Sequence, residues 1–211
     1  MLGENDDLTL YLLRHGESVA NTQGVFASRK IDSPLSLMGR QQVERQSKIL
    51  APIRFDACYT SPLVRATQSA EILRREAGLQ FVQTNALLEV DVGVLDGEPE
   101  DVSQNMALYE EVLREWEYGL HTAAFPGGES LQDIQARFAS LLEDVKGTNR
   151  VLLLGHCLLF MCAIWLFAEN HGSTLETGHM GRGNLSLLVK TEGGYRLQEF
   201  NQAPPETISS H

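Results

Sequence analysis

The sequence predicts an α/β/α sandwich of three layers, in which a mostly parallel sheet lies between helices and a small helical cap is inserted. Short β-prone runs alternate with segments of helical periodicity, which is the pattern of α/β domains. Three of the runs end abruptly in polar clusters, as strands do where a parallel sheet opens toward a ligand. The length of 211 residues and the 43% hydrophobic content suit one domain with a sizeable core. We therefore expect a single domain over 1–211, with the cap at about 94–128.

Local signals justify each expected element. The predicted strands cover 8–13, 55–59, 81–84, 151–154, 185–189 and 195–200, with the last two forming a hairpin around Gly193 and Gly194. The predicted helices cover 35–49, 63–77, 102–118, 129–145 and 158–167. Ser36 suits the N-cap of the first helix, and Pro62 and Gly78 bracket the second. The acidic segment 102–118 is separated from the next helix by Pro126 and two glycines, so we place it in the cap.

One apolar segment, 151–168, allows two interpretations. It contains no Asp, Glu, Lys or Arg, and its length reaches the lower limit for a membrane-spanning helix. However, Gly155 and His156 interrupt it near its start, and an imidazole is costly in lipid. Strands that are covered on both faces also form continuous apolar runs. We therefore favour a buried strand, a turn and a buried helix over a membrane span.

Composition limits the classes of function. With 17 basic and 28 acidic residues, the formal charge of −11 repels a nucleic-acid backbone, so general nucleic-acid binding is not expected. The three cysteines, Cys58, Cys157 and Cys162, lie in apolar surroundings without zinc-type spacing, which favours free thiols in a reducing compartment. The first seven residues are acidic, unlike a signal peptide. We expect a cytoplasmic location without membrane attachment.

The polar clusters predict an anion pocket. The first strand ends in Arg14 and His15, the second leads to Arg65, and the fourth ends at His156. Since the carboxyl ends of parallel strands meet at one edge of the sheet, these side chains should converge. The planar guanidinium of arginine can bind two phosphoryl oxygens at once, and a neutral imidazole can attack phosphorus and become phosphorylated. Two arginines supply the positive charge, so we expect neither a metal nor a cofactor.

At this point the chain resembles the histidine phosphatase superfamily, which is also called the phosphoglycerate mutase-like family. The resemblance rests on ordered blocks that span 10–190: Leu13-Arg14-His15-Gly16-Glu17-Ser18 with Asn21, Asp32-Ser33-Pro34-Leu35-Ser36 with Gly39, Ser61-Pro62-Leu63-Val64-Arg65-Ala66, Leu88-Glu89 with Gly93, Pro126-Gly127-Gly128-Glu129-Ser130, Gly155-His156 and Asn184-Leu185-Ser186. The family often has glycine after the second histidine, where this chain has Cys157 and Leu158.

The resemblance implies a role for each matched residue. His15 would be the phosphorylated nucleophile, and Arg14, Arg65 and His156 would form the phosphate pocket, with Asn21 at its edge. Glu89 would be the general acid and then the general base; this assignment comes from the family alone. Asp91 and Asp96 are the alternative acids. Arg29 and Lys30 are expected either to reach a second anionic group of the substrate or to be ordinary surface charges. In the cap, contact with substrate is the alternative to an anchoring role for Trp116 and a loop or surface position for His121. Structural or surface positions are expected for Cys157, His171, His179 and His211.

These residues predict a metal-independent phosphomonoester hydrolase of the histidine acid phosphatase type, acting on a small-molecule phosphomonoester. The first alternative is phosphoglycerate mutase-type phosphoryl transfer, but the mutases of the family carry longer insertions before the second histidine. The second alternative is a non-catalytic module that binds a phosphorylated ligand or protein, although none of the pocket residues is lost here. The sequence leaves the oligomeric state open, including a homodimer.

Overall fold

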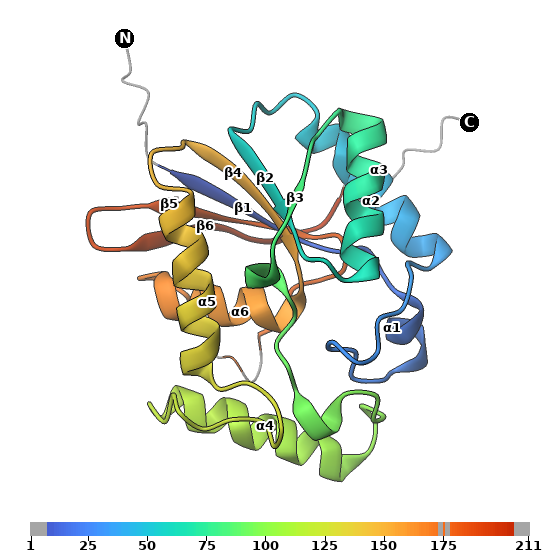
Figure 1. Cartoon of the computed structure of the whole chain (residues 1–211), viewed down its shortest axis with the longest axis vertical. Coiled ribbons are helices and arrows are strands. Elements are labelled where there is room, and N and C mark those ends of the chain that lie inside the picture. The colour runs from blue at the N-terminus through green and yellow to red at the C-terminus, as the bar shows by residue number, and fades with distance from the viewer. Residues whose placement is uncertain (1–7, 173–174, 176–177, 205–211) are drawn as a thin grey trace.

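The structure is a computed structural model that describes residues 8–172, 175 and 178–204. Its centre is a six-stranded sheet in the order β3-β2-β4-β1-β5-β6 (Figure 1). The strands are β1 (Thr9–Arg14), β2 (Ala57–Thr60), β3 (Val82–Gln83), β4 (Arg150–Gly155), β5 (Leu185–Lys190) and β6 (Tyr195–Gln202). The first four pair in parallel, and β5 runs antiparallel to both β1 and β6. The predicted α/β class with a mostly parallel sheet is therefore confirmed.

Helices cover both faces of this sheet and make the three layers. They are α1 (Val19–Gln23), α2 (Leu37–Leu50), α3 (Val64–Ala77), α4 (Ser103–Glu117), α5 (Leu131–Asp144) and α6 (Cys157–Phe167), with short 3-10 turns at η1 (Asn85–Leu87) and η2 (Gly93–Leu95). Figure 1 shows α2 and α3 on one side of the sheet and α5 and α6 on the other. Side chains alternate accordingly: Leu10 and Leu12 enter the core cluster with α5 and α6, whereas Leu13 enters the cluster with α2 and α3.

The local signals explain where most elements begin and end. The Ser36 side chain accepts a hydrogen bond from the Gly39 amide at the start of α2, and Gly78 adopts the left-handed conformation that ends α3. One predicted element is shorter than expected, and one element was missed. The strand predicted over 81–84 is only Val82–Gln83, and the short helix α1 was not predicted, although a capping box between Ser18 and Asn21 marks its start.

The apolar segment 151–168 is a strand followed by a helix. It forms most of β4, which is buried from Val151 onward, and then α6, with His156 as the N-cap residue between them. The buried strand–turn–helix is confirmed. Within the described residues, no helix is long and apolar enough to cross a membrane.

The segment around 94–128 lies across the end of the sheet. Figure 1 shows α4 below α5 and α6, on the side where the parallel strands end. Trp116 is fully buried, donates its indole N–H to the Ala123 carbonyl and contacts Phe125 edge to face at 5.5 Å. Trp116 also belongs to the same buried cluster as Leu10 and Leu12 of β1, so it anchors α4 to the main core, as expected. The division into one domain with an inserted cap stays a prediction.

Close backbone packing at Gly39 fixes the loop after β1. A Cβ atom on Gly39 would overlap the Glu17 carbonyl, and one on Gly16 would overlap the Gly39 carbonyl. We expect Gly39→Ala to destabilise the fold by about 3 kcal/mol, at the upper end for overpacking, because backbone atoms cannot move aside. Urea unfolding measures this, with the exposed Leu37→Ala on the same helix as control. Equal free energies of unfolding for both variants would contradict the close packing.

Candidate active site

A cavity of about 300 Å³ lies where the parallel strands end, between the sheet and α4. Its polar wall consists of Arg14, His15, Asn21, Ser28, Arg65, Glu89, Glu100 and His179. Its apolar wall includes Phe26, Val92, Met106, Tyr109, Leu158 and Leu175. The structure therefore brings five of the six predicted site residues to one cavity, and the sixth, His156, lies against His15 behind the wall.

His15 is held as a neutral imidazole whose Nε2 carries the lone pair. Its Nδ1 atom lies 2.6 Å from the Gly16 carbonyl oxygen, which can only accept, so Nδ1 carries the proton. Its Nε2 atom accepts a hydrogen bond from Nε of Arg65 at 3.2 Å. Burial, with help from Arg65 and Arg14, holds the pKa of His15 well below its ordinary value. This is the protonation state that a nitrogen nucleophile needs.

His156 is fully buried beside His15. The two ring centroids are 5.1 Å apart at an interplanar angle of 60°. Its Nε2 atom lies 2.8 Å from the Ser61 hydroxyl, whereas its Nδ1 atom is buried and has no hydrogen-bond partner among the described residues. Burial, followed by the charge of Arg65, lowers the pKa of His156 well below its ordinary value. If the Ser61 hydroxyl donates to Nε2, then Nδ1–H is a donor ready for an anion.

Arg65 is placed by the start of α3. It is the second residue of that helix, and Asp32 from a distant loop caps the helix by accepting from the Val64 amide at 2.8 Å. The Arg65 side chain is only 1% exposed. It donates to the carbonyls of Ala27 and Ser28 at 3.0 Å each, and its Nη1 lies 3.6 Å from Asp32. A buried guanidinium with this many donors is fixed in orientation.

Arg14, at the end of β1, is also buried. Its Nη1 donates to Nε2 of His179 at 3.2 Å and to the Met180 carbonyl, and its Nε has no partner within the described part of the chain. His179 was expected to be an ordinary surface or loop residue. It is exposed, but it also lines the cavity. No local signal could have revealed this, because the contact depends on residues 178–180 folding back over the end of β1.

Of the three candidate acids, only Glu89 faces the cavity. Its Oε1 accepts from the amides of Val90 and Leu159 at 2.9 Å each, and its Oε2 accepts from the Leu158 amide at 3.3 Å. The first turn of α6 therefore orients the carboxylate. The carboxylate of Asp96, in contrast, is buried and accepts from the amides of four consecutive residues, 28–31. Asp91 accepts from the Gly93 amide.

Two further expectations concern the edge of the site. Asn21 lines the cavity as predicted, and its Oδ1 is engaged in the capping box of α1. Cys157 was expected to serve in packing, with redox sensitivity as the alternative. It is half-buried and forms part of the cavity wall, with its Sγ 3.7 Å from Nδ1 of His179. Burial raises the pKa of Cys157, which keeps the thiol protonated.

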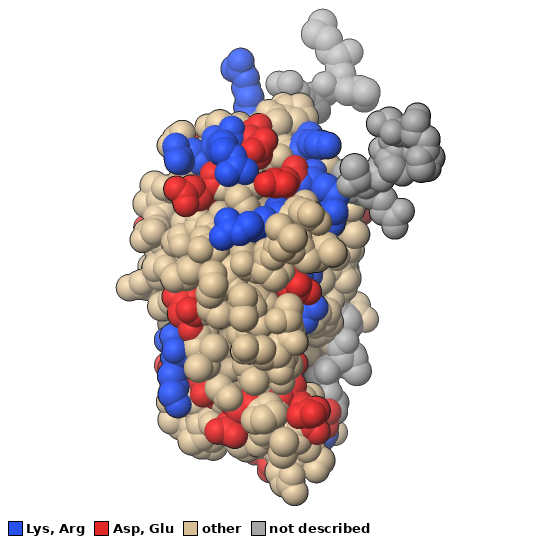
Figure 2. Space-filling view, turned by 90° about the vertical axis from the view of Figure 1, so that its right-hand side faces the viewer, with Lys and Arg blue, Asp and Glu red and all other residues tan. Residues whose placement is uncertain are grey.

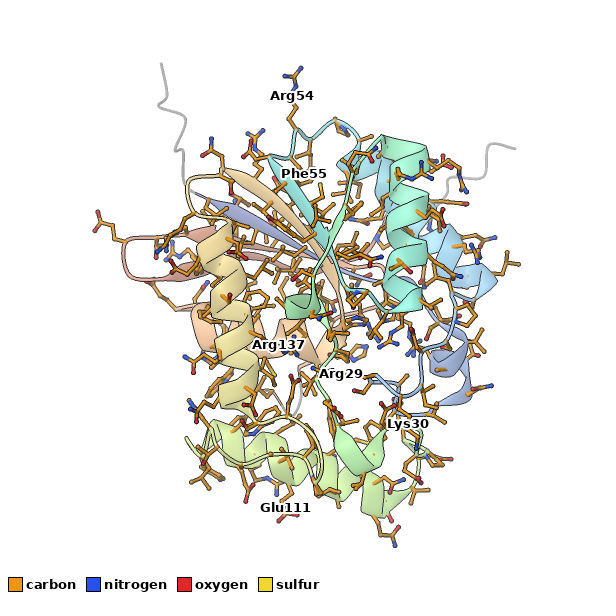
Figure 3. All side chains as sticks on the ribbon, in the orientation of Figure 1. Arg29, Lys30, Arg54, Phe55, Glu111 and Arg137 are labelled. Atoms are coloured by element: carbon orange, nitrogen blue, oxygen red, sulfur yellow. The ribbon has the colours of Figure 1, made fainter. Side chains whose placement is uncertain are left out.

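The Arg29 side chain is held by contacts within the protein, whereas Lys30 is exposed. Arg29 forms an ion pair with Glu129 at 2.7 Å and donates to the Glu89 carbonyl at 2.9 Å. Figure 3 shows Arg29 and Arg137 converging between the sheet and α4, where both bind Glu129. Among the remaining histidines, His121 and His171 contact Trp165, and His211 lies outside the described residues. In the part of the chain that is described, no group of three His, Cys, Asp or Glu residues could hold a metal ion.

Comparison with known proteins agrees with this geometry. The family model of the histidine phosphatase superfamily (branch 1) matches residues 10–203. The chain belongs to this superfamily. A probable phosphoglycerate mutase of Salmonella choleraesuis is 30% identical over 161 residues, which cover 74% of this chain and 73% of that protein. Phosphoserine phosphatase 1 of Hydrogenobacter thermophilus is 31% identical over 137 residues, or 65% of this chain and 64% of that enzyme, a little under two thirds of its length.

Solved structures of the superfamily share the fold. A phosphoglycerate mutase from Bacillus anthracis superposes with a TM-score of 0.77 at 21% identity and covers 93% of both chains. A mycobacterial glucosyl-3-phosphoglycerate phosphatase superposes with a TM-score of 0.76 at 24% identity, covering 93% of this chain and 100% of its own. The fold is therefore the phosphoglycerate mutase-like α/β/α sandwich. Family and relatives support an enzyme of the phosphatase type, with mutase-like relatives alongside.

The Ser61–His156 contact yields a test in this histidine phosphatase. Ser61→Ala removes the partner of His156 Nε2 and frees the tautomer, so we expect kcat for 4-nitrophenyl phosphate to fall about tenfold with little change in KM. Ser61→Thr keeps the hydroxyl and should restore most of the rate. Ser47→Ala, a buried serine on α2, is the matched control. Equal losses in Ser61→Ala and Ser61→Thr would contradict a positioning role for the hydroxyl.

Acid should destabilise the fold through the two buried imidazoles. The pKa of each is lowered in the folded state, whereas unfolding returns it to about 6.5. Below that pH, the unfolded state binds protons that the folded state does not. The stability is therefore present above pH 6.5 and is lost as the pH falls toward the lowered pKa, by up to about 1.4 kcal/mol per pH unit for each imidazole.

Urea unfolding from about pH 7.5 to about pH 5.5 measures this effect. His156→Gln should lose free energy of unfolding less steeply on acidification than the wild type, whatever its stability at neutral pH. Ser47→Ala, which removes a buried hydroxyl and no titratable group, should follow the wild-type slope. Parallel curves for all three proteins would show that His156 is protonated in the folded state.

Proposed function

We propose that this chain is a metal-independent phosphomonoesterase that acts through a phosphohistidine on His15. The observation that carries the proposal is the neutral His15 imidazole, with its Nε2 lone pair held by Arg65 at the wall of a cavity that also contains Arg14 and Glu89. A nucleophile, two cationic clamps and one carboxylate are the groups that a two-step hydrolysis requires.

In the first step, Nε2 of His15 attacks phosphorus, and the bond from phosphorus to the alcohol oxygen breaks. Glu89 transfers a proton to the departing oxygen. We assign this transfer to Oε2, because Oε1 already accepts two shorter hydrogen bonds. Throughout, His15 Nδ1–H remains bound to the Gly16 carbonyl, which stabilises the charge that develops on the ring.

In the second step, the Glu89 carboxylate removes a proton from water, and the oxygen attacks phosphorus as the bond to His15 breaks. Inorganic phosphate leaves, and His15 and Glu89 return to their starting protonation states. The same carboxylate acts as acid and then as base, as microscopic reversibility suggests.

The arginines supply the electrostatic stabilisation. Two buried guanidinium groups face the cavity, and the nearest carboxylate ion-paired to either is Asp32, at 3.6 Å from Arg65. A phosphoryl dianion at about 4 Å from one such cation gains about 4 kcal/mol per charge at an effective dielectric constant of about 20. With the Ser61 hydroxyl donating to Nε2 of His156, the unpartnered Nδ1–H of His156 is a further donor for the phosphoryl oxygens, as is the Nε–H of Arg14. Asn21 adds an amide donor at the edge.

Hydrolysis leads over the two alternatives. The insertion between Glu89 and His156 is compact, which disfavours the mutase reaction, and every pocket residue is retained, which disfavours a purely binding module. The histidine acid phosphatase type is a finer designation that stays a prediction. All three cysteines are free, and this supports the proposed cytoplasmic location. A small-molecule phosphomonoester is the proposed partner, and a homodimer stays a prediction.

Hydrolysis of 4-nitrophenyl phosphate in excess EDTA tests the proposal. The wild type should release phosphate, and His15→Ala should lose at least about 1000-fold in kcat, because the covalent route is gone. His121→Ala is the matched histidine control. Acid-labile, base-stable labelling from phosphate-labelled substrate should appear in the wild type only.

Two outcomes would overturn the proposal. Unchanged hydrolysis in His15→Ala would exclude the phosphohistidine. Rapid interconversion of 3-phosphoglycerate with a bisphosphoglycerate primer, and little phosphate release, would assign the mutase reaction instead.

A further inference from the structure

We infer that the substrate is a phosphomonoester whose alcohol part is apolar, preferably aromatic, and carries no second anionic group. This inference rests on the proposed phosphomonoesterase function. It concerns the part of the cavity beyond the phosphate-binding groups, where the leaving alcohol would lie.

The wall of this part is apolar and includes a stack of aromatic rings. Tyr109 of α4 packs between Phe26, at 5.3 Å, and Phe125, at 5.8 Å with the ring planes 28° apart. Phe125 is buried and braced edge to face by Trp116, so the stack is rigid. Leu158 and Met106 also line the cavity. A flat, apolar group can bury its surface here without leaving a polar group unpaired.

No cation remains for a second anionic group. All 17 lysines and arginines of the chain fall within the described residues, and only Arg14 and Arg65 line the cavity. Both are assigned to the phosphoryl group. Arg29 is ion-paired with Glu129 instead. His179 accepts from Arg14, and its pKa is lowered by burial and by Arg14, so it presents no positive charge at neutral pH.

The residues around the cavity carry negative charge. Glu100 lines the cavity at its exposed edge. Residues 96–118 contain eight acidic residues and one arginine: Asp96, Glu98, Glu100, Asp101, Glu110, Glu111, Glu115 and Glu117 against Arg114. Figure 2 shows mostly acidic side chains at the lower end of the molecule, where α4 lies, whereas most of the basic ones lie at the opposite end, mixed with acidic ones. A carboxylate or second phosphate on the alcohol would therefore meet repulsion.

Three matched esters test this inference: benzyl phosphate, 4-carboxybenzyl phosphate and 4-(aminomethyl)benzyl phosphate. Their remote substituents change the charge but hardly change the leaving oxygen. We expect kcat/KM for the carboxylate to be at least about tenfold below that of benzyl phosphate, and the ammonium ester to equal or exceed it. Methyl phosphate, without the ring, should be the poorest of the uncharged substrates.

Variants of the cavity wall test which residues cause the preference for an uncharged, aromatic alcohol. Glu100→Gln should raise kcat/KM for the carboxylate ester about threefold relative to benzyl phosphate, because it removes the charge at the cavity edge. Glu111→Gln is the matched control, since Figure 3 shows Glu111 pointing outward from α4. Tyr109→Ala should reduce the ratio of kcat/KM for benzyl phosphate to kcat/KM for methyl phosphate, because it removes the aromatic ring from the apolar wall.

The two levels of the proposal fail in different ways. Absence of hydrolysis for every ester would overturn the proposed function. In that case, calorimetric binding of benzylphosphonate and 4-carboxybenzylphosphonate still decides the inference, with tighter binding of the uncharged compound expected. Equal or preferred use of the carboxylate ester, alongside normal hydrolysis, would overturn the inference and leave the phosphomonoesterase intact.

Discussion

The site depends on one buried cation, the guanidinium of Arg65. A charge this deep is tolerated only when its donors are satisfied, and here they are met by the Ala27 and Ser28 carbonyls and by Nε2 of His15. Those carbonyls are in place because the buried Asp96 carboxylate collects the amides of residues 28–31. The Asp96 carboxylate thus holds the loop of residues 28–31, and the carbonyls of this region orient the Arg65 guanidinium. The guanidinium in turn orients Nε2 of His15 through a hydrogen bond.

The two cations of the cavity lie within a protein that is acidic as a whole. The chain carries a formal charge of −11, yet the floor of the cavity holds the two cations Arg14 and Arg65, whose charges add to burial in lowering the pKa of both neighbouring imidazoles. The floor therefore attracts one phosphoryl group, while Glu100, from the acidic segment 96–118, lines the cavity at its exposed edge. Because the positive charge is confined to the cavity floor, the site favours ligands with a single anionic group, whatever reaction follows binding.

Sequence reasoning reached the parts of this structure that depend on local pattern. Periodicity, Ser36 and Gly78 predicted the main helices, and the rule that ligands bind at strand ends predicted that Arg14, His15 and His156 lie together. Sequence patterns could not predict the contacts that form where a loop folds back over the sheet. The role of Glu89 was expected only through family resemblance, its contact with α6 was not predicted, and His179 was missed, because each depends on how a loop crosses a strand end. The five-residue α1 is too short to show a periodicity.

The first turn of α6 joins catalysis to specificity. His156 is its N-cap residue, and the amides of Leu158 and Leu159 hold the Glu89 carboxylate, so the second imidazole and the acid share one rigid support. The side chains of Cys157 and Leu158 line the cavity at that same turn, where the family often has glycine. A glycine there would widen the chamber without touching the amides. The larger side chains therefore make the space for the alcohol smaller and more apolar, and the backbone that orients the acid is unaffected.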